Sequence, residues 1–191
     1  MSEKEDLRVK RTKKALGDAF IKLLAEKTFE SITVNEMCDE AGVRRATFYK
    51  HYTDKFNFLT SYTHSLRNRF DTLIWKSEKP DCTAKYYVAY AKRIIGFINE
   101  HESEINNILK SAMFPSVMAV VVEQNYKDTC DRLRKSVEAG MKLTASVEVT
   151  ASICAGGVAS AIYMWLVTGK KQSADELAEE VGAVVSVAIE N

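Results

Sequence analysis

Helix-breaking residues are scarce in this sequence of 191 residues, which contains only two prolines and eight glycines. Because both residue types disfavour helix interiors, and because alanine, leucine, lysine and glutamate are abundant, the composition favours a mostly helical protein. Hydrophobic residues make up 46% of the chain and charged residues 28%. This balance is typical of a folded globular protein and excludes general disorder.

Cysteine is also scarce, and its spacing fits no metal or redox motif. Cys38, Cys82, Cys130 and Cys154 are separated by 44, 48 and 24 residues, far from a C-x-x-C pattern. We interpret them as small apolar residues in a reducing cytoplasm. We therefore expect no metal site and no cofactor.

No segment has the pattern of a secretory signal or a membrane anchor. Residues 1–14 are polar and charged, unlike a signal peptide. The most apolar stretch, residues 147–168, contains Glu148 and two adjacent glycines, which favours a buried helix over a membrane span. These features predict a cytoplasmic protein with no membrane partner.

Catalytic motifs are absent as well. The sequence contains no G-x-G-x-x-G, H-E-x-x-H or G-x-S-x-G pattern. The fragment Thr168-Gly169-Lys170 is not a P-loop, because Met164 stands where the first glycine of that motif is required. His64 and His101 have no nucleophile or ligand partner at a recognisable spacing. We therefore expect no catalytic residues and a function other than catalysis.

Positive charge is concentrated in the first third of the chain, although the formal net charge is only +1. Residues 8–14 contain five cations and no acid, and residues 44–55 contain four cations, one histidine and one acid. A near-neutral chain does not coat nucleic acid by bulk electrostatics, so the local clusters are more informative. For residues 8–14, a solvated helix face remains the alternative.

The spacing of apolar residues predicts nine helices, no β-hairpin and no internal repeat, which is an all-α fold. The pattern Thr33-Val34-Asn35-Glu36 predicts a capping box, as does Ser173-Ala174-Asp175-Glu176. Thr12 is a candidate N-cap for the first helix. The expected helices span residues 13–26, 34–40, 44–52, 54 to the break at 79–81, 83–100, 102–111, 115–139, 147–168 and 174 to the C-terminus.

Two of these helices, residues 34–40 and 44–52, are joined by a turn at Gly42, which is a helix-turn-helix arrangement. At 100° per residue, Phe48 and Tyr52 point inward. The outward face then presents Arg45 with Tyr49 and Ala46 with Lys50. Long donors at the start of such a helix meet base edges in the major groove.

The run TFESITVNEMCDEAGVRRATFYKHYTDKFNFL, residues 28–59, resembles the DNA-binding segment of TetR-family transcriptional regulators. The resemblance covers residues 8–60, and its most specific part is T-F-Y-x-H-Y-x-x-K from Thr47 to Lys55. Beyond it, only the chain length, the helix count and the small-residue-rich eighth helix are similar. Cys38 and Arg44 depart from residues common in the family, and Arg44 leaves the N-cap of the recognition helix open.

The resemblance implies an operator-binding surface made from both clusters. Base-facing positions match Arg45, Ala46, Tyr49 and Lys50. Phosphate-contacting positions match Thr33, Thr47, Tyr49, His51 and Lys55, with Arg11 and Lys14 along the flanking backbone or in the minor groove. His51 could instead belong to an aromatic cluster beside Tyr52, and Tyr49 could be partly packed in the core.

The resemblance also implies a DNA-binding domain at residues 1–53 and a helical ligand-sensing and dimerisation domain at residues 54–191. A homodimer is expected to pair the last two helices with their symmetry mates; internal packing is the alternative. The candidate interface residues are Gly156, Gly157, Ser160, Ala161, Trp165, Val181, Val184 and Val185.

Family resemblance further implies a small-molecule effector of unknown identity, bound among aromatic and methionine side chains. Each of these could also be plain core. The candidates are Tyr62, Phe70, Tyr86, Tyr90, Phe97, Met113, Met118 and Tyr126. The expected function is a ligand-responsive repressor that binds a palindromic operator on double-stranded DNA. The alternatives are an activator, or an interaction module without small-molecule control.

Overall fold

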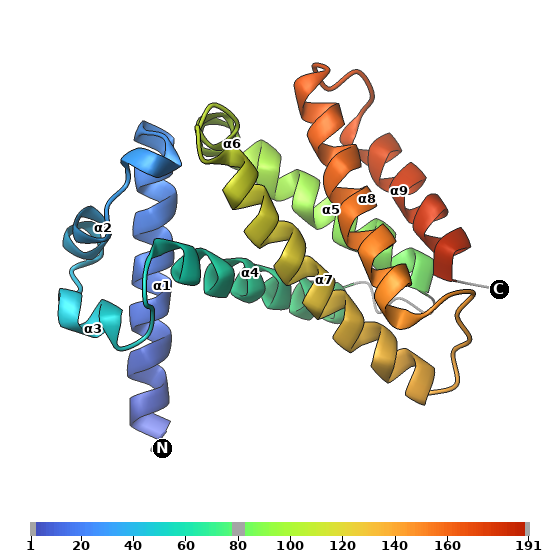
Figure 1. Ribbon diagram of the computed structural model, residues 1–191, viewed down its shortest axis with the longest axis horizontal. Coiled ribbons are helices and arrows are strands. Elements are labelled where there is room, and N and C mark those ends of the chain that lie inside the picture. The colour runs from blue at the N-terminus through green and yellow to red at the C-terminus, as the bar shows by residue number, and fades with distance from the viewer. Residues whose placement is uncertain (1–2, 78–82, 190–191) are drawn as a thin grey trace. The chain divides into compact units, whose positions relative to one another are not determined.

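The structure is a computed structural model that describes residues 3–77 and 83–189, and every regular element in these ranges is helical. The prediction of an all-α fold is confirmed, with nine α-helices and one short 3₁₀-helix in the part of the chain described (Figure 1). The elements are α1 (Glu3–Glu26), η1 (Phe29–Ser31), α2 (Val34–Ala41), α3 (Arg45–Tyr49), α4 (Lys55–Ser77), α5 (Thr83–Glu100), α6 (Glu102–Leu109), α7 (Phe114–Glu138), α8 (Val147–Val167) and α9 (Ala174–Ile189).

The helices pack into two compact units, which we call the first and second unit. The first unit comprises Met1–Tyr62 with His101–Val120, and the second comprises Thr63–Glu100 with Val121–Asn191. Helices α4 and α7 therefore contribute residues to both. The packing units follow different bounds from the functional domains predicted at residues 1–53 and 54–191, and that functional division stays a prediction.

Aromatic rings form the core of the first unit. Phe58 of α4 lies with its ring centroid 5.3 Å from that of Phe20 in α1 and 5.3 Å from that of Tyr52. Phe48 of α3 and Phe29 of η1 are fully buried in the same core. Burial of such large apolar surfaces holds the short helices α2 and α3, which could not persist alone, against α1 and α4.

Helix α6 and the turn after it complete the first unit from a distant part of the sequence. The Asn107 side chain donates hydrogen bonds to the carbonyls of Leu24 (2.8 Å) and Ala25 (3.2 Å), near the end of α1. Glu30 of η1 accepts a short hydrogen bond from the Ser111 hydroxyl and one from the Ala112 amide at 3.1 Å. These bonds satisfy backbone groups that helix ends leave unpaired.

The second unit is built around α5, which packs closely against α9. Gly182 lets the two helices approach, because a Cβ at this position would lie 2.0 Å from Cγ2 of Val88. Ile95 of α5 and Leu133 of α7 are almost completely buried in the same unit.

The buried cysteines agree with their interpretation as small apolar residues. Cys38, Cys130 and Cys154 are buried, and burial raises the pKa of the Cys38 and Cys154 thiols. Cys82 and the predicted break at residues 79–81 lie outside the described residues.

Two predicted helix ends were wrong. The first helix begins at Glu3, so Thr12 lies inside α1 and is not its N-cap. The cause is visible in residues 3–12, which contain no glycine or proline and include many good helix formers. The third helix is shorter than expected, ending at Tyr49, and the chain tightens there through a bond from the Lys50 amide to the Phe48 carbonyl.

Candidate nucleic-acid interface

Helix α2, which precedes α3, is fixed at both ends, by a side-chain capping box at its start and by a glycine at its end. The Thr33 hydroxyl accepts a hydrogen bond from the Glu36 amide (3.2 Å), and the Glu36 carboxylate accepts one from the Thr33 amide (2.9 Å). This confirms the predicted capping box. Gly42 then ends α2 in the left-handed region, with φ of 62°, where a side chain would be strained. The start of α3 is thereby held in a defined direction.

Helix α3 separates an inner face from an outer face, as the periodicity predicted. Phe48 and Tyr52 are buried at 0% and 5% exposure, whereas the Tyr49 side chain is 56% exposed. The predicted base-facing residues Arg45, Ala46, Tyr49 and Lys50 are all exposed. Arg44 occupies the N-cap position without a side-chain capping bond, which leaves its guanidinium on the surface as well.

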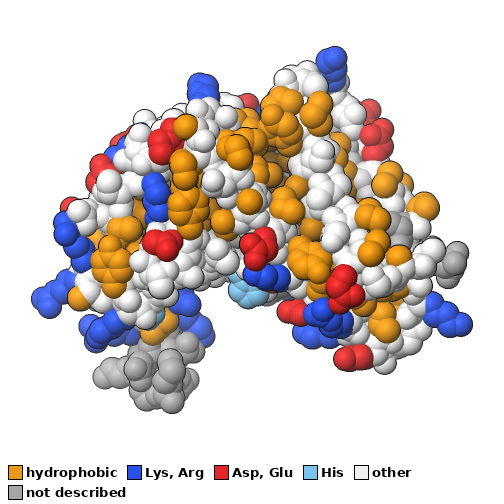
Figure 2. All heavy atoms as spheres, in the orientation of Figure 1, with side chains coloured by type: hydrophobic (Ala, Val, Ile, Leu, Met, Phe, Trp, Pro, Cys, Tyr) orange, Lys and Arg blue, Asp and Glu red, His pale blue; other side chains and the backbone are white. Residues whose placement is uncertain are grey.

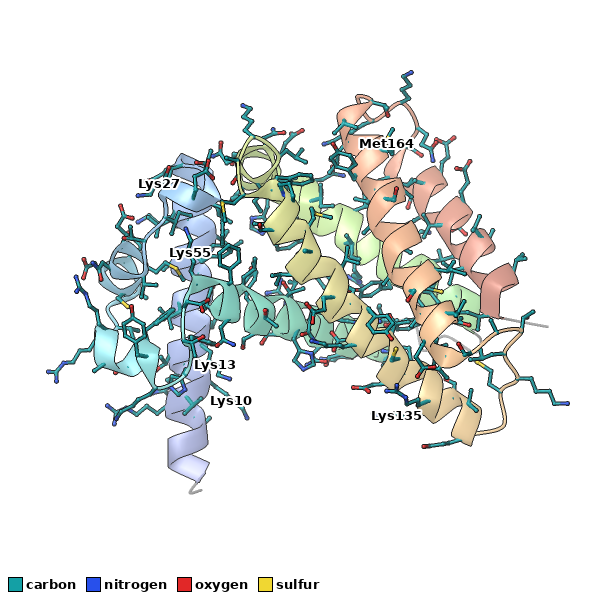
Figure 3. All side chains as sticks on the ribbon, in the orientation of Figure 1. Lys10, Lys13, Lys27, Lys55, Lys135 and Met164 are labelled. Carbon is teal, nitrogen blue, oxygen red and sulfur yellow. The ribbon has the colours of Figure 1, made fainter. Side chains whose placement is uncertain are left out.

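Exposed cations of α1 extend the positive surface within the same unit. Figure 2 shows lysine and arginine side chains gathered over α3 and the adjoining part of α1. Lys10 and Lys13 project from α1 in Figure 3. Arg11 is exposed, and Lys14 is exposed with its ammonium group 2.6 Å from Asp18. Such an exposed pair is weak and can exchange its acid for a phosphate.

The remaining predicted phosphate contacts have different surroundings. The Thr33 hydroxyl already serves the α2 cap, although its side chain is exposed. Thr47 and His51 are partly buried, and the His51 ring centroid lies 6.1 Å from that of Tyr52. Contact with Tyr52 and contact with a phosphate are compatible for His51, so both roles stay predictions.

Lys55 has a structural role that the sequence did not indicate. Its ammonium group donates to the carbonyls of Phe29 (2.9 Å), Glu30 (3.2 Å) and Ile32 (3.0 Å), and it lies 4.6 Å from the Phe29 ring centroid (Figure 3). A lysine has three N–H donors. All three are used inside the first unit, so this geometry leaves none for the phosphate contact predicted for Lys55. The correction has a clear cause, because Lys55 is only partly exposed and fastens α4 to η1.

Residues predicted for the dimer interface fall into two groups. Gly156, Gly157, Ser160, Ala161 and Val184 are at least partly exposed. Trp165, Val181 and Val185 are covered by their own chain, at 7%, 8% and 5% exposure, and the Trp165 indole donates to the Gln172 carbonyl at 2.9 Å. The second group therefore follows the alternative of internal packing, because its faces of α8 and α9 point into the second unit.

A continuous apolar face of α8 is exposed that the prediction only partly included. Val149, Ile153, Met164 and Val167 are 50% to 57% exposed. With Gly157 and Ser160 they recur at steps of three or four residues, so they share one side of the helix. Met164 projects from α8 in Figure 3, and apolar side chains follow α8 in Figure 2. Helix α8 is long and apolar enough to span a membrane by composition, but 33% of its most apolar window is buried in the protein.

The predicted ligand-pocket residues are divided between the two units. Tyr62, Met113 and Met118 belong to the first unit, where Tyr62 contacts Phe20 with ring centroids 5.7 Å apart. The other five belong to the second unit. Among them Phe70 contacts Tyr90 and Phe97, and Tyr90 stacks on Tyr86 at 6.0 Å. The Tyr126 hydroxyl instead forms a hydrogen bond with the Cys130 side chain.

One buried charge in the second unit was missed. Arg67 is only 4% exposed, although arginine is among the residues least often buried. Its position was a signal that could have revealed it: Arg67 precedes buried Phe70 by three residues and buried Ile74 by seven. A cation within a buried stripe of a helix indicates either a buried partner or a ligand.

Sequence comparison assigns the DNA-binding segment. Residues 18–60 match the family described as bacterial regulatory proteins, tetR family. Over 55 residues the chain is 46% identical to YxbF of Bacillus subtilis (strain 168), a helix-turn-helix-type transcriptional regulator. This similarity spans 28% of the present chain and 14% of YxbF, so it concerns the DNA-binding segment alone.

Comparison with solved structures extends the likeness to the whole fold. A TetR-family regulator from Rhodococcus sp. superposes with a TM-score of 0.66 at 16% identity, covering 95% of this chain and all of that one. The regulator FadR of Bacillus subtilis, solved in complex with stearoyl-CoA, superposes with a TM-score of 0.60 at 16% identity over 92% of this chain and 98% of that one. The predicted family resemblance is confirmed by the matched segment and this shared fold.

Proposed function

We propose that this chain is a TetR-family transcriptional regulator that represses transcription by binding a palindromic operator as a homodimer and releases it when a small molecule binds. The observation that supports operator binding most directly is the outer face of α3. There Arg45, Ala46, Tyr49 and Lys50 are exposed on a helix that follows α2, whose two ends are fixed by the Thr33 cap and Gly42.

Arg45 and Lys50 are the proposed base readers. Arginine can donate two hydrogen bonds to guanine O6 and N7, and Ala46 is small enough for close approach or for contact with a thymine methyl group. The α1 cations, including Arg11 and Lys14, are proposed to contact phosphates beside the reading helix. Phosphate contacts set affinity and position, whereas base contacts set sequence preference.

Dimerisation is supported by the exposed apolar face of α8 and by two valines on α9. Val184 and Val187 are 70% and 79% exposed. Contiguous apolar surfaces of this kind mark interaction sites. A second copy of the same face would cover them, and a two-fold axis would give each dimer two reading helices for two half-sites.

An apolar or amphipathic effector is proposed for the second unit. Its support is the aromatic cluster of Phe70, Tyr86, Tyr90 and Phe97, together with the stearoyl-CoA bound to the structurally similar FadR. By thermodynamic linkage, an effector that lowers operator affinity must itself bind less tightly to the operator-bound protein.

The proposal assigns the protein no catalytic role and places it in the cytoplasm with its DNA. Its test is fluorescence anisotropy with a labelled fragment from immediately upstream of the protein's own gene. We expect saturable binding that falls steeply with salt and two chains per fragment. A second fragment with one half-site scrambled should bind far more weakly. Equal affinity for both fragments would exclude palindrome reading by a dimer.

A further inference from the structure

Arg67 of α4 is a buried cation without a carboxylate partner among the described residues. Its Nη1 donates to the Asn125 side-chain oxygen at 3.1 Å and to the Thr129 hydroxyl at 3.3 Å. Both acceptors are neutral groups of α7. The guanidinium lies 4.6 Å from the Tyr90 ring centroid, which offers a partial cation–π interaction. Its Nη2 is buried and has no hydrogen-bond acceptor.

Burying the Arg67 charge in this way lowers the stability of the unliganded protein. Arginine stays charged in proteins, so it cannot escape the cost of burial by losing its proton. A buried charge is normally paired with an opposite charge, and an unpaired one destabilises the fold. The acceptors on Asn125 and Thr129 supply hydrogen bonds but no negative charge.

Two acids on the packed helices form their hydrogen bonds with residues other than Arg67, although the Asp71 charge still favours the charged form of Arg67. Asp71 accepts hydrogen bonds from the Tyr86 hydroxyl and from Nη2 of Arg132, both at 2.6 Å. Asp128 bonds Nδ1 of His64 at 2.8 Å and Nε2 of Gln124 at 2.9 Å, both through Oδ1. Asp128 forms no ion pair with Arg67, although its Oδ2 is unpartnered.

Groups that can donate outnumber acceptor-only groups among the unpartnered buried atoms described in the same unit. Nη2 of Arg67 and Nε of Arg132 can only donate, the hydroxyls of Tyr87 and Thr150 can donate or accept, and a single carboxylate oxygen of Asp128 can only accept. Burial raises the pKa of the Tyr87 phenol to about 12, although the positive charge of Arg67 acts to lower that pKa. The phenol therefore keeps its O–H at neutral pH. A group that only accepts hydrogen bonds, and carries negative charge, would match this set.

We propose that the second unit binds a small organic carboxylate, with the carboxylate accepting hydrogen bonds from Nη2 of Arg67 and the Tyr87 hydroxyl. The apolar part of the molecule would contact the aromatic cluster at Phe70, whose ring lies 6.1 Å from Phe97 and 6.4 Å from Tyr90. A single negative charge is favoured over a phosphate dianion, because Asp71 and Asp128 already place two carboxylates near the site. This inference rests on the effector part of the proposed function and specifies its chemistry.

The test measures the melting temperature of the full-length protein with sodium benzoate and sodium octanoate as probes. Neutral benzamide and octanol, and sodium chloride at equal ionic strength, are the reference additives. We expect the melting temperature to rise saturably with the concentration of at least one carboxylate. Its neutral counterpart should not raise the melting temperature. Isothermal titration should then give an affinity that Arg67→Met lowers about 10- to 100-fold, the range for one charge-assisted hydrogen bond.

Two further variants separate binding from folding. Arg69→Met removes an exposed arginine two positions along the same helix and should leave carboxylate binding unchanged. Tyr87→Phe keeps the ring and its packing, so it tests the site even where Arg67→Met does not fold; it should weaken binding several-fold. Unchanged carboxylate affinity in both Arg67→Met and Tyr87→Phe would overturn the site.

Other outcomes are equally decisive. A larger rise in melting temperature with phenyl phosphate than with benzoate would overturn the choice of carboxylate. The absence of a saturable rise in melting temperature with any of these anions would overturn the anion site. Operator affinity is measured separately in the presence of the bound probe. Carboxylate binding that leaves operator affinity unchanged would uphold the site and contradict the proposed regulation.

Discussion

The positively charged side chains of Arg45, Lys55 and Arg67 have different surroundings, because they differ in exposure and in the hydrogen-bond acceptors near them. Arg45 is exposed on α3 with its guanidinium free to meet DNA. The Lys55 ammonium group donates hydrogen bonds to three backbone carbonyls of its own chain. Arg67 is buried with neutral acceptors only. Residue type alone does not distinguish the proposed DNA contact of Arg45, the structural lysine and the proposed ligand-binding arginine.

Replacing Arg45 by alanine should cost about 1–3 kcal/mol of operator binding and relax the preference at one base position, because a bidentate guanine contact is lost. The comparison variant is Arg11→Ala on α1. It should weaken all sequences alike and reduce the slope of log affinity against log salt by about one. Anisotropy titrations against a set of operators with single base changes measure both. An equal loss of base preference in the two variants would contradict this division of roles.

Replacing Lys55 by methionine should destabilise the first unit by about 1–3 kcal/mol, because three backbone carbonyls lose their donor. The free energy of unfolding is measured by urea titration followed by circular dichroism. Lys50→Met, at an exposed position of the same stretch, is the matched control and should leave stability nearly unchanged while weakening DNA binding. A Lys55→Met variant with full stability and reduced salt dependence would restore the phosphate role.

At the scale of the element, helix ends marked by a capping motif could be predicted from sequence, whereas the start of α1, the end of α3 and part of the helix faces could not. Thr33 and Gly42 act on their immediate neighbours, so a four-residue pattern was enough to locate the ends of α2. The face of α8 that turns inward could not be derived in this way. Its apolar residues surround the helix, and periodicity does not distinguish Trp165 in the core from Met164 on the surface. Lys55 and Arg67 were misjudged or missed because their partners are distant in sequence.

Glu30 within η1 and Glu36 in the capping box of α2 predict an acid-sensitive first unit. A hydrogen bond from Ser111 holds the pKa of Glu30 at about 2, and one from Lys27 does the same for Glu36. Both values lie below the ordinary 4.5. Lowered carboxyl pKa values stabilise the fold above pH 4.5, and that contribution is lost as the pH falls from there towards 2.

Urea midpoints recorded at pH 7, 4.5 and 3 test this. The wild type should lose stability across this interval more steeply than a Glu30→Gln, Glu36→Gln double variant, which lacks the two titrating groups. Glu26→Gln, at an exposed position of α1, is the control and should retain the wild-type slope. Parallel slopes in the wild type and the double variant would refute the role of these caps.

Two glycines in the second unit should respond oppositely to alanine. At Gly182 a Cβ would meet Cγ2 of Val88, and the Val88 Cα lies 3.3 Å away, so Gly182→Ala should destabilise by about 1–3 kcal/mol through overpacking. At Gly157 an added Cβ would meet no atom within 4 Å beyond its own helix backbone and chain neighbours, so Gly157→Ala should be neutral or stabilising by up to about 1 kcal/mol from helix propensity. Val88→Ala should partly rescue Gly182→Ala in a double-mutant cycle; the absence of coupling would exclude this contact as the cause.

At the scale of the whole molecule, the same open position becomes a test of assembly. Gly157→Arg adds a long charged side chain at a position where the added Cβ would meet no neighbouring atom. We expect an intact helical circular dichroism spectrum, a monomer in analytical ultracentrifugation, and specific operator affinity reduced by at least about 100-fold, because the two reading helices are no longer tethered. A variant that remains dimeric would exclude this face of α8 from the interface. A folded monomer with undiminished operator affinity would overturn the dimeric mechanism.

The first unit is assembled from two stretches of chain, and this has a consequence for how the protein is made. Asn107, Ser111 and Ala112 hold the ends of α1 and η1, yet they leave the ribosome about 80 residues after Leu24 and Glu30, at separations of 83, 81 and 82 residues. During synthesis the DNA-reading helices therefore emerge before the residues that secure them. A nascent chain stalled at residue 62 should expose α1 to protease, and protection should appear only once residue 120 has cleared the exit tunnel.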